Sequence, residues 1–270
     1  MITLKQDWFT QELEDAGILV GGGESIAQKL NLEDSQSSFL FAVSPNSAWM
    51  YFLTVGFGPS YSSTYEDSIF SRLCELGVSA IFPGLRILFY SNHRPGSFRI
   101  NFEGIWETVS ETELQRRFYV VDPSFMGEVG NVKPINKSIN DAFQVWSRTF
   151  LNPYCVVNDI DALAAGVKTN KIIELKRPIE DIAEWKPYKS DLKNFQRSSE
   201  LALKTNSVIM NIAYNQKSTP GKLVQVFTTP VKEINSTSIS YSKLVISSSE
   251  AIDYILDKKQ ITLIHDSSQR

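Results

Sequence analysis

Cysteine and histidine are scarce in this chain of 270 residues, which contains two of each. The cysteines, Cys74 and Cys155, are too few for a disulfide framework and lack the close spacing of a metal site. Two histidines leave little material for histidine-based metal sites or for Ser-His-Asp catalysis. This cysteine usage fits the reducing conditions of the cytoplasm.

Long hydrophobic runs are also missing. No uninterrupted apolar stretch approaches the roughly 18 residues that span a bilayer, and the first residues do not show the basic-then-apolar order of a signal peptide. Hydrophobic residues make up 42% of the chain and charged residues 21%, which excludes disordered and collagen-like classes. We therefore expect a soluble, cytoplasmic protein that binds no membrane and forms one large domain or two small ones.

Negative charge is concentrated in the first half of the chain. Residues 1–136 contain nine Lys and Arg against sixteen Asp and Glu, a formal net charge of −7, whereas residues 137–270 contain eighteen against fourteen, a net charge of +4. A polyanion is attracted to the second half and repelled by the first, although a difference between solvated surfaces accounts for the asymmetry equally well. Because no segment forms a basic tail, nucleic-acid binding requires a shaped site.

Residues 1–136 combine helical and strand patterns. Apolar spacing predicts helices over 7–16, 24–30 and 63–76, and aromatic and β-branched stretches predict strands over 39–57, 85–90 and 97–107. Ser110 and Glu113 have the spacing of a capping box that opens another helix. This half is predicted to be an α+β domain, and its residues do not indicate a chemical role.

Residues 137–270 follow a more regular order. Apolar residues at helical spacing predict an amphipathic helix over 138–151, and a second helix begins near Pro187 and continues to about Lys204. Strands are predicted over 154–163, 171–176 and 207–214. The resulting order of elements is helix, strand, strand, helix, strand.

Charged residues lie in pairs on two of these predicted strands. Alternate side chains of a strand share a face, so Glu174 and Lys176 point one way while the apolar residues between and before them point into the core. Asp159 and Asp161 share a face for the same reason, and pairing of the two strands brings one of them beside Glu174. Neighbouring carboxylates repel each other unless a cation lies between them. Mg²⁺ suits such oxygen ligands better than Zn²⁺ does.

The residues Asp-Ile-Asp, followed after twelve residues by Glu-Leu-Lys, and the order of elements over residues 138–214 resemble the PD-(D/E)xK nuclease superfamily. Its restriction-endonuclease-like fold implies an α/β core with a central mixed sheet flanked by helices in residues 137–270, preceded here by the α+β domain of residues 1–136. The resemblance assigns Asp161 and Glu174 as ligands of Mg²⁺, for which Mn²⁺ substitutes, with Asp159 as an alternative ligand. Lys176 is then the lysine that orients or activates the attacking water.

This resemblance implies Mg²⁺-dependent hydrolysis of phosphodiester bonds in nucleic acid. A bound metal supplies Lewis acidity and a lowered water pKa, and Lys176 adds a positive donor beside the water. DNA is favoured over RNA because most of the superfamily cuts DNA, and restriction or host defence, with a homodimer or a protein partner bound through the N-terminal domain, is a role by analogy. The alternative is a non-catalytic nucleic-acid-binding or scaffold protein, in which Glu174 and Lys176 form an ordinary charge pair.

Further candidate site residues surround this pattern. Many members of the superfamily carry an additional acidic residue on the first core helix, where this chain offers Asp141 and, on a neighbouring face, Gln144. Arg177 follows Lys176 and is either a phosphate contact or a salt-bridged arginine. Asp191 and Gln196 lie on the later helix, where members of the superfamily use polar residues, although solvated helix positions account for both as well.

Overall fold

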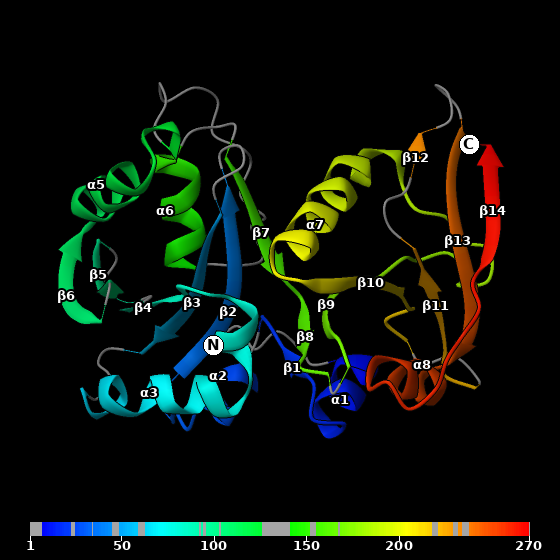
Figure 1. Cartoon of the computed structure of the whole chain (residues 1–270), viewed down its shortest axis with the longest axis horizontal. Helices are drawn as coiled ribbons and strands as arrows, with labels where there is room; N and C mark the ends of the chain where they lie inside the picture. Colours follow the sequence, from blue (N-terminus) through cyan, green and yellow to red (C-terminus); the bar gives the residue numbers. More distant parts are fainter. Residues whose placement is uncertain are drawn as a thin grey trace. The chain divides into compact units, whose positions relative to one another are not determined.

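The computed structural model describes most of the chain. The described residues are 7–22, 25–33, 35–44, 49–58, 63–91, 93, 96–102, 104–125, 141–151, 155–166, 168–217, 221–228, 232–233 and 238–269. The chain divides into two compact units: unit 1 comprises Met1–Leu4 and Gly21–Asp159, and unit 2 comprises Lys5–Val20 and Ile160–Arg270. Each unit combines a mixed sheet with helices, which confirms the predicted mixed α and β fold class (Figure 1). Within the described ranges, none of the helices has the length and apolar character needed to cross a membrane.

Unit 1 is built on a six-stranded sheet with the order β6-β5-β4-β3-β2-β7. Its strands are β2 (Ser35–Ser44), β3 (Met50–Phe57), β4 (Arg86–Ser91), β5 (Ser97–Phe102), β6 (Ile105–Ser110) and β7 (Val156–Ile160). The parallel strands β3 and β4 are connected through two helices, α3 (Thr64–Glu75) and α4 (Val78–Ile81). The described part of the unit also contains α2 (Ser25–Lys29), α5 (Glu111–Val121), the short η1 (Pro123–Phe125) and α6 (Ala142–Phe150).

Aromatic side chains fill the core between the unit 1 sheet and helices α5 and α6. Phe52 of β3 stacks on Phe118 of α5 with ring centroids 5.0 Å apart, and Phe118 contacts Trp146 of α6 at 5.1 Å. All three side chains are buried, and aromatic pairs of this kind stabilise a core beyond the area that they bury. The aromatic face of α6 therefore fixes this helix on the sheet of unit 1.

Unit 2 is built on an eight-stranded sheet with the order β1-β8-β9-β10-β11-β13-β12, in which β14 also pairs with β13. Its strands are β1 (Leu19–Val20), β8 (Ala162–Ala164), β9 (Asn170–Lys176), β10 (Ser207–Ala213), β11 (Leu223–Phe227), β12 (Lys232–Glu233), β13 (Ser238–Ser247) and β14 (Ile264–Gln269). Its helices are α1 (Trp8–Asp15), η2 (Lys189–Asp191), α7 (Leu192–Lys204) and α8 (Ser248–Ile255). β8 and β9 are antiparallel, whereas β9 and β10 are parallel and are connected through α7.

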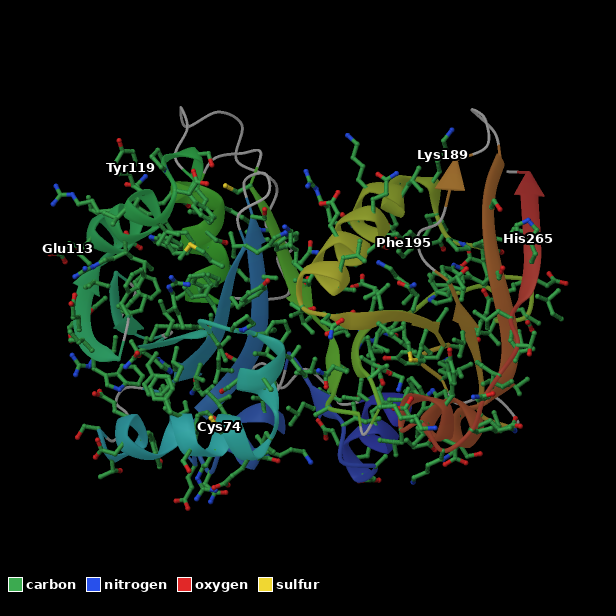
Figure 2. The ribbon with its side chains drawn as sticks, in the orientation of Figure 1. Cys74, Glu113, Tyr119, Lys189, Phe195 and His265 are labelled. Carbon is green, nitrogen blue, oxygen red and sulfur yellow. The ribbon has the colours of Figure 1, made fainter. Side chains whose placement is uncertain are left out.

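Helices cover both faces of the unit 2 sheet. On one face, Phe9 of α1 and Ile255 of α8 are buried in a cluster with Ile173 of β9. On the other face, Phe195 of α7, labelled in Figure 2, contacts Phe227 of β11 with ring centroids 5.6 Å apart. The sheet is therefore the middle layer of unit 2, and β9 lies near its centre.

Unit 1 is inserted between two paired strands of unit 2. β1 is antiparallel to β8, with Leu19 opposite Leu163 and Val20 opposite Ala162. The chain leaves unit 2 after Val20 and returns at Ile160. This division differs from the boundary placed at 136 from the sequence. α6, expected in the second domain, packs in unit 1, and α1, expected in the first domain, packs in unit 2, because each buries its apolar face on that unit's sheet.

Several predicted elements have different bounds in the structure. Residues 154–163 do not form one strand: they contain β7 and β8, which belong to different sheets. Residues 97–107 contain β5 and β6, which are separated by a turn at Gly104, where the φ of 86° favours glycine. The helices expected over 138–151 and from Pro187 begin later, at Ala142 and Leu192, and residues 138–140 lie outside the described residues. The predicted capping box of Ser110 and Glu113 is present at α5.

Candidate functional site

β9 presents Glu174 and Lys176 together on one face of the unit 2 sheet. Leu175 lies between them in the sequence and is buried on the opposite face among the side chains of α1 and α8. This is the alternation that the sequence predicts for a strand with one polar segment. Both charged residues are among the last three residues of β9, which ends at Lys176.

Lys176 contacts two carboxylates. Its Nζ lies 3.0 Å from Oε1 of Glu174 and 3.4 Å from Oδ2 of Asp191. The side chains of Lys176 and Glu174 are each 19% exposed, so the pair is largely buried but reachable from solvent. The ammonium also lies 5.5 Å from the centre of the Phe195 ring, where the face of an aromatic ring attracts a cation.

The charge state of Lys176 follows from these neighbours. Burial lowers the pKa of Lys176, but the negative charges of Glu174 and Asp191 outweigh burial, and the pKa is raised above its ordinary value. Asp161 acts in the same direction. Lys176 is therefore a protonated ammonium at neutral pH, and in this state it donates hydrogen bonds but accepts no proton.

Asp161 lies beside this pair, at the point where β7 and β8 separate. The β8–β9 register pairs Ala162 with Ile173, which puts Asp161 level with Glu174 on the neighbouring strand. The backbone N–H of Leu175 donates to Oδ2 of Asp161 over 2.7 Å. The carboxylate thus accepts a hydrogen bond from a backbone group of β9 where β8 no longer runs alongside it.

Asp191 reaches Lys176 from the start of α7. It precedes the helix, but its side chain makes no capping hydrogen bond there. The chain leading to it is fixed on the sheet by the buried side chain of Gln225, whose Nε2 donates to the carbonyl oxygens of Ile182 and Trp185 over 2.7 and 3.1 Å. Position 191 is therefore set by packing and hydrogen bonds that are independent of Lys176.

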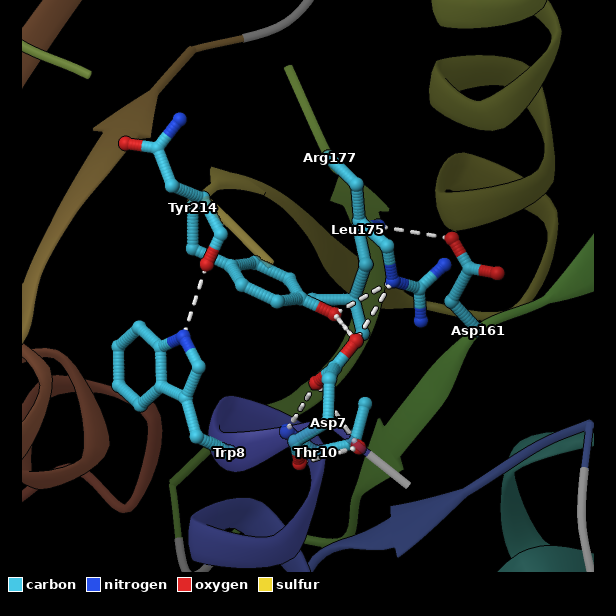
Figure 3. A network of polar contacts seen from close by, with 8 residues as sticks. Asp7, Trp8, Thr10, Asp161, Leu175, Arg177 and Tyr214 are labelled. Atoms are coloured by element: carbon cyan, nitrogen blue, oxygen red, sulfur yellow. Dashed lines mark hydrogen bonds and ion pairs between the residues drawn. The ribbon is translucent and has the colours of Figure 1, made fainter. Parts of the chain in front are cut away.

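Arg177 belongs to a second polar group, shown in Figure 3. Its Nε donates to Oδ2 of Asp7 over 2.8 Å and to the hydroxyl oxygen of Tyr214 over 2.7 Å. The Tyr214 hydroxyl in turn donates to the same Asp7 oxygen over 2.7 Å. Asp7 is also the N-cap of α1, since its other oxygen accepts from the backbone N–H of Thr10 over 3.0 Å. Arg177 thus forms a salt bridge with Asp7, as one of its two interpretations from the sequence predicts.

The pKa values of this group show that its charges are stable at neutral pH. Burial raises the pKa of Asp7, but hydrogen bonds from Tyr214, the Thr10 backbone and Arg177 together outweigh it, so the pKa lies below its ordinary value. Burial is also the main reason why the pKa of Tyr214 is raised, which keeps its hydroxyl protonated. Asp7 is therefore an anion that anchors a cationic Arg177.

Asp141 and Gln144, the candidates on the predicted first core helix, belong to α6 of unit 1. Asp141 is 2% exposed and caps α6, accepting from the backbone N–H of Gln144 over 2.9 Å. Its other oxygen accepts a hydrogen bond from the buried hydroxyl of Tyr90. Burial raises the pKa of Asp141. These contacts account for Asp141 as a capping residue inside unit 1.

The remaining candidates, Asp159 and Gln196, do not join the group around Lys176. Asp159 lies on β7 and is assigned to unit 1, whereas the second segment of unit 2 begins at Ile160 and includes Asp161. Gln196 is exposed on α7. Of the sequence candidates, Asp161, Glu174, Lys176 and Asp191 are thus brought together, with Arg177 following directly after β9.

No metal-binding group of three or more His, Cys, Asp or Glu side chains is present among the described residues. Two carboxylates, Asp161 and Glu174, lie level with each other at the end of the β8–β9 hairpin, and Asp191 lies across Lys176 from Glu174. The donors are oxygen atoms, which is the ligand type that Mg²⁺ and Mn²⁺ prefer. The chemistry of these donors therefore fits a hard divalent cation.

Comparison of the chain with protein-family models, with curated proteins and with solved structures gave no match.

Two residues of the site were not found from the sequence. Asp7 is visible as the residue preceding an amphipathic helix, which predicts a cap but not a contact with a strand 170 positions away. Tyr214 follows an apolar strand, and its aromatic side chain is typical of a core residue. Their partnership with Arg177 depends on α1 packing against β9 and β10, which only the structure reveals.

Proposed function

We propose that unit 2 is a metal-dependent nuclease that hydrolyses phosphodiester bonds in nucleic acid, with DNA favoured over RNA. The observation that carries this proposal is the position of Asp161 level with Glu174 on neighbouring strands, with Lys176 in contact with Glu174. These are the three residues to which the resemblance to the PD-(D/E)xK superfamily assigns the two metal ligands and the lysine. A cytoplasmic setting and a restriction or defence role follow from that resemblance alone.

The order of elements also supports the resemblance, with one substitution. α1 and β1 come first in unit 2, followed by β8, β9, α7 and β10, so a helix precedes the paired strands and a helix connects the parallel pair β9 and β10. The helix expected in first place over 138–151 is replaced in this role by α1. The additional acidic residue that many members of the superfamily carry on the first core helix is then sought on α1, whose N-cap is Asp7.

The charges of the site favour a divalent cation. Four carboxylates, those of Asp7, Asp161, Glu174 and Asp191, surround the two cations Lys176 and Arg177, which leaves a formal charge of −2. A phosphodiester anion is repelled by this charge. One Mg²⁺ ion bound by Asp161 and Glu174 neutralises it.

Each residue then has a role in hydrolysis. A bound Mg²⁺ supplies Lewis acidity and a water of lowered pKa. Glu174 and Asp161 hold the ion, and Asp161 keeps its orientation through the hydrogen bond from the Leu175 backbone. Lys176, which is protonated at neutral pH, orients the water and stabilises the charge that develops on the phosphate oxygens rather than removing a proton.

A non-catalytic binding or scaffold protein is the second candidate function. The observation that favours it is the pairing of Lys176 with both Glu174 and Asp191, because such an ion pair satisfies these groups without a metal. A protein of this kind keeps the fold and binds nucleic acid without cutting it.

Cleavage assays with plasmid DNA and with single-stranded DNA and RNA, in Mg²⁺ and in EDTA, separate the two candidates. We expect Mg²⁺-dependent cleavage by the wild type and a loss of about 10²-fold or more in Glu174→Ala, because a metal ligand is removed. Glu200→Ala is the matched control, since Glu200 is an exposed carboxylate on α7 that pairs with Arg197. A wild type that binds nucleic acid but cuts none of these substrates contradicts the nuclease and supports the binding protein.

A further inference from the structure

Arg177 has a feature that its salt bridge does not use. Both of its hydrogen bonds come from Nε, whose acceptors are Asp7 and Tyr214. Over the described residues, the two terminal nitrogens of the guanidinium donate to no carboxylate, hydroxyl or carbonyl oxygen. The side chain is 40% exposed. Arg177 therefore holds a fixed position while one edge of its planar group stays available.

That available edge faces the candidate metal ligands. In Figure 3 the terminal nitrogens of Arg177 are turned toward Asp161. The charge of Asp161 is also one of the causes that raise the pKa of Arg177, which agrees with their proximity. Asp161 acts on Lys176 in the same way. Asp161 is thus flanked by two cations that come from consecutive residues of the chain.

The backbone around Arg177 is fixed as well. The backbone N–H of Tyr214 donates to the carbonyl oxygen of Lys176 over 3.0 Å, and Nδ2 of Asn215 donates to the carbonyl oxygen of Pro178 over 2.9 Å. The ring of Tyr214 also lies 5.6 Å from the guanidinium carbon. Holding the arginine in place before a ligand arrives reduces the side-chain entropy that binding costs.

We propose that the terminal edge of Arg177 binds a backbone phosphate of the nucleic acid beside the metal ligands, with Asp7 and Tyr214 as positioning residues for the arginine. A guanidinium edge matches two phosphate oxygens in geometry and charge, which the single ammonium of a lysine does not. The inference rests on the proposed nuclease function, since it names the substrate contact of the same site. It assigns Arg177 a role in holding the substrate, whereas Lys176 acts on the reacting water.

Binding is measured separately from cleavage in order to test this contact. A short fluorescein-labelled DNA oligonucleotide is titrated with protein in Ca²⁺, a hard cation with oxygen ligands that replaces Mg²⁺ to suppress turnover. The fluorescence anisotropy is recorded at several salt concentrations, and the same proteins are assayed for cleavage in Mg²⁺. The variants are R177Q, R177K and the control R197Q. Arg197 also pairs with a carboxylate, that of Glu200 at 2.8 Å, and is 34% exposed.

We expect R177Q to bind the oligonucleotide about ten-fold more weakly at low salt, equally for different sequences, and to reduce the slope of log affinity against log salt by about one. R197Q leaves both quantities unchanged. R177K keeps the charge and loses the planar edge, so its slope stays that of the wild type while its affinity falls several-fold. Loss of slope reports a phosphate contact, because a purely structural defect does not change the number of phosphates neutralised.

The two proposals fail in different ways. If R177Q binds with the affinity and salt slope of R197Q, the phosphate contact is overturned even when the wild type cuts DNA. If the wild type binds but does not cut, the nuclease fails, while the comparison of R177Q with R197Q still decides the contact. Absence of both binding and cutting by the wild type overturns both. Should R177Q not fold, as judged by circular dichroism, R177K decides: wild-type affinity in R177K overturns the contact.

Discussion

Single residues of this site act through the charges beside them. Lys176 stays protonated because Glu174 and Asp191 outweigh the effect of burial on its pKa. Arg177, the next residue, is anchored by Asp7. The two consecutive cations thus pair with different carboxylates, while the charge of Asp161 acts on both of them. A conservative substitution at either position changes geometry as well as charge.

The pKa of Asp7 makes a pH-dependent prediction for stability. Since hydrogen bonds hold this pKa below its ordinary value of 3.8, the stabilisation from Asp7 is fully present above that pH. It is lost as the pH falls through the lower pKa of the folded state. We expect Asp7→Asn to lower the free energy of unfolding by about 1–2 kcal/mol at neutral pH, because the cationic Arg177 then donates to a neutral acceptor instead of an anionic one.

Urea unfolding of wild type and Asp7→Asn at pH 7 and near pH 3 measures this effect. The difference between the two proteins should shrink at the lower pH, because Asp7 becomes protonated there, whereas the other carboxylates titrate in both proteins and cancel in the comparison. Asparagine remains a good N-cap, so α1 keeps its capping hydrogen bond in the variant. A difference that is the same at both pH values contradicts the anchoring role of the Asp7 carboxylate.

At the scale of elements, Asp161 is the single residue between two strands that belong to different sheets. β7 belongs to the sheet of unit 1 and β8 to that of unit 2, with Asp161 between them. Its carboxylate accepts the hydrogen bond of the Leu175 backbone. The residue therefore has a structural task in the hairpin and a proposed task as metal ligand, and two substitutions separate these tasks.

Asp161→Asn retains an oxygen that can accept from Leu175, whereas Asp161→Ala does not. We expect the free energy of unfolding of Asp161→Asn to lie within about 0.5 kcal/mol of that of the wild type. That of Asp161→Ala should be lower by about 1–2 kcal/mol, because a backbone N–H loses its acceptor. Both variants should lose Mn²⁺ affinity and cleavage, since both lack the anionic ligand. Urea unfolding and calorimetric Mn²⁺ titration test this, and equal Mn²⁺ affinity in Asp161→Asn and wild type removes Asp161 from the ligand set.

The sequence predicts these elements better than it predicts their partners. The apolar spacing of Phe143 and Trp146 correctly indicates a helix, but it states only that one face is buried and not which sheet buries it. The alternation around Glu174 correctly gives the polar face of β9 because that signal is local. By contrast, the run from residue 154 to 163 has the composition of a single strand. Its division at Asp161 depends on two sheets that are formed by distant parts of the chain.

At the scale of the whole molecule, the charge asymmetry seen in the sequence becomes smaller. When the chain is divided by units rather than at residue 136, unit 2 carries seventeen Lys and Arg against sixteen Asp and Glu, a formal net charge of +1, and unit 1 carries −4. A general attraction of unit 2 for a polyanion is therefore weak. Nucleic-acid binding by unit 2 has to rest on local groups such as Lys176 and Arg177.

The insertion of unit 1 predicts which fragments fold. A chain in which residues 7–20 are joined through a short glycine-containing loop to residues 160–270 keeps α1, β1 and the whole unit 2 sheet. We expect it to unfold cooperatively in urea. Residues 137–270 alone should not, because they lack α1, whose Phe9 and Leu13 cover one face of the sheet. Circular dichroism and NMR dispersion of both fragments test this, and cooperative unfolding of residues 137–270 contradicts the division.

The pairing of β1 with β8 has a consequence for synthesis on the ribosome. α1 and β1 emerge well before β8, because all of residues 21–159 must be translated in between. At roughly 5–20 residues per second this delay is on the order of ten seconds. During that time the apolar side chains of α1 have no sheet to cover. The apolar face of α1 in a nascent chain thus stays exposed until residues 160–164 have been synthesised and β8 can pair with β1.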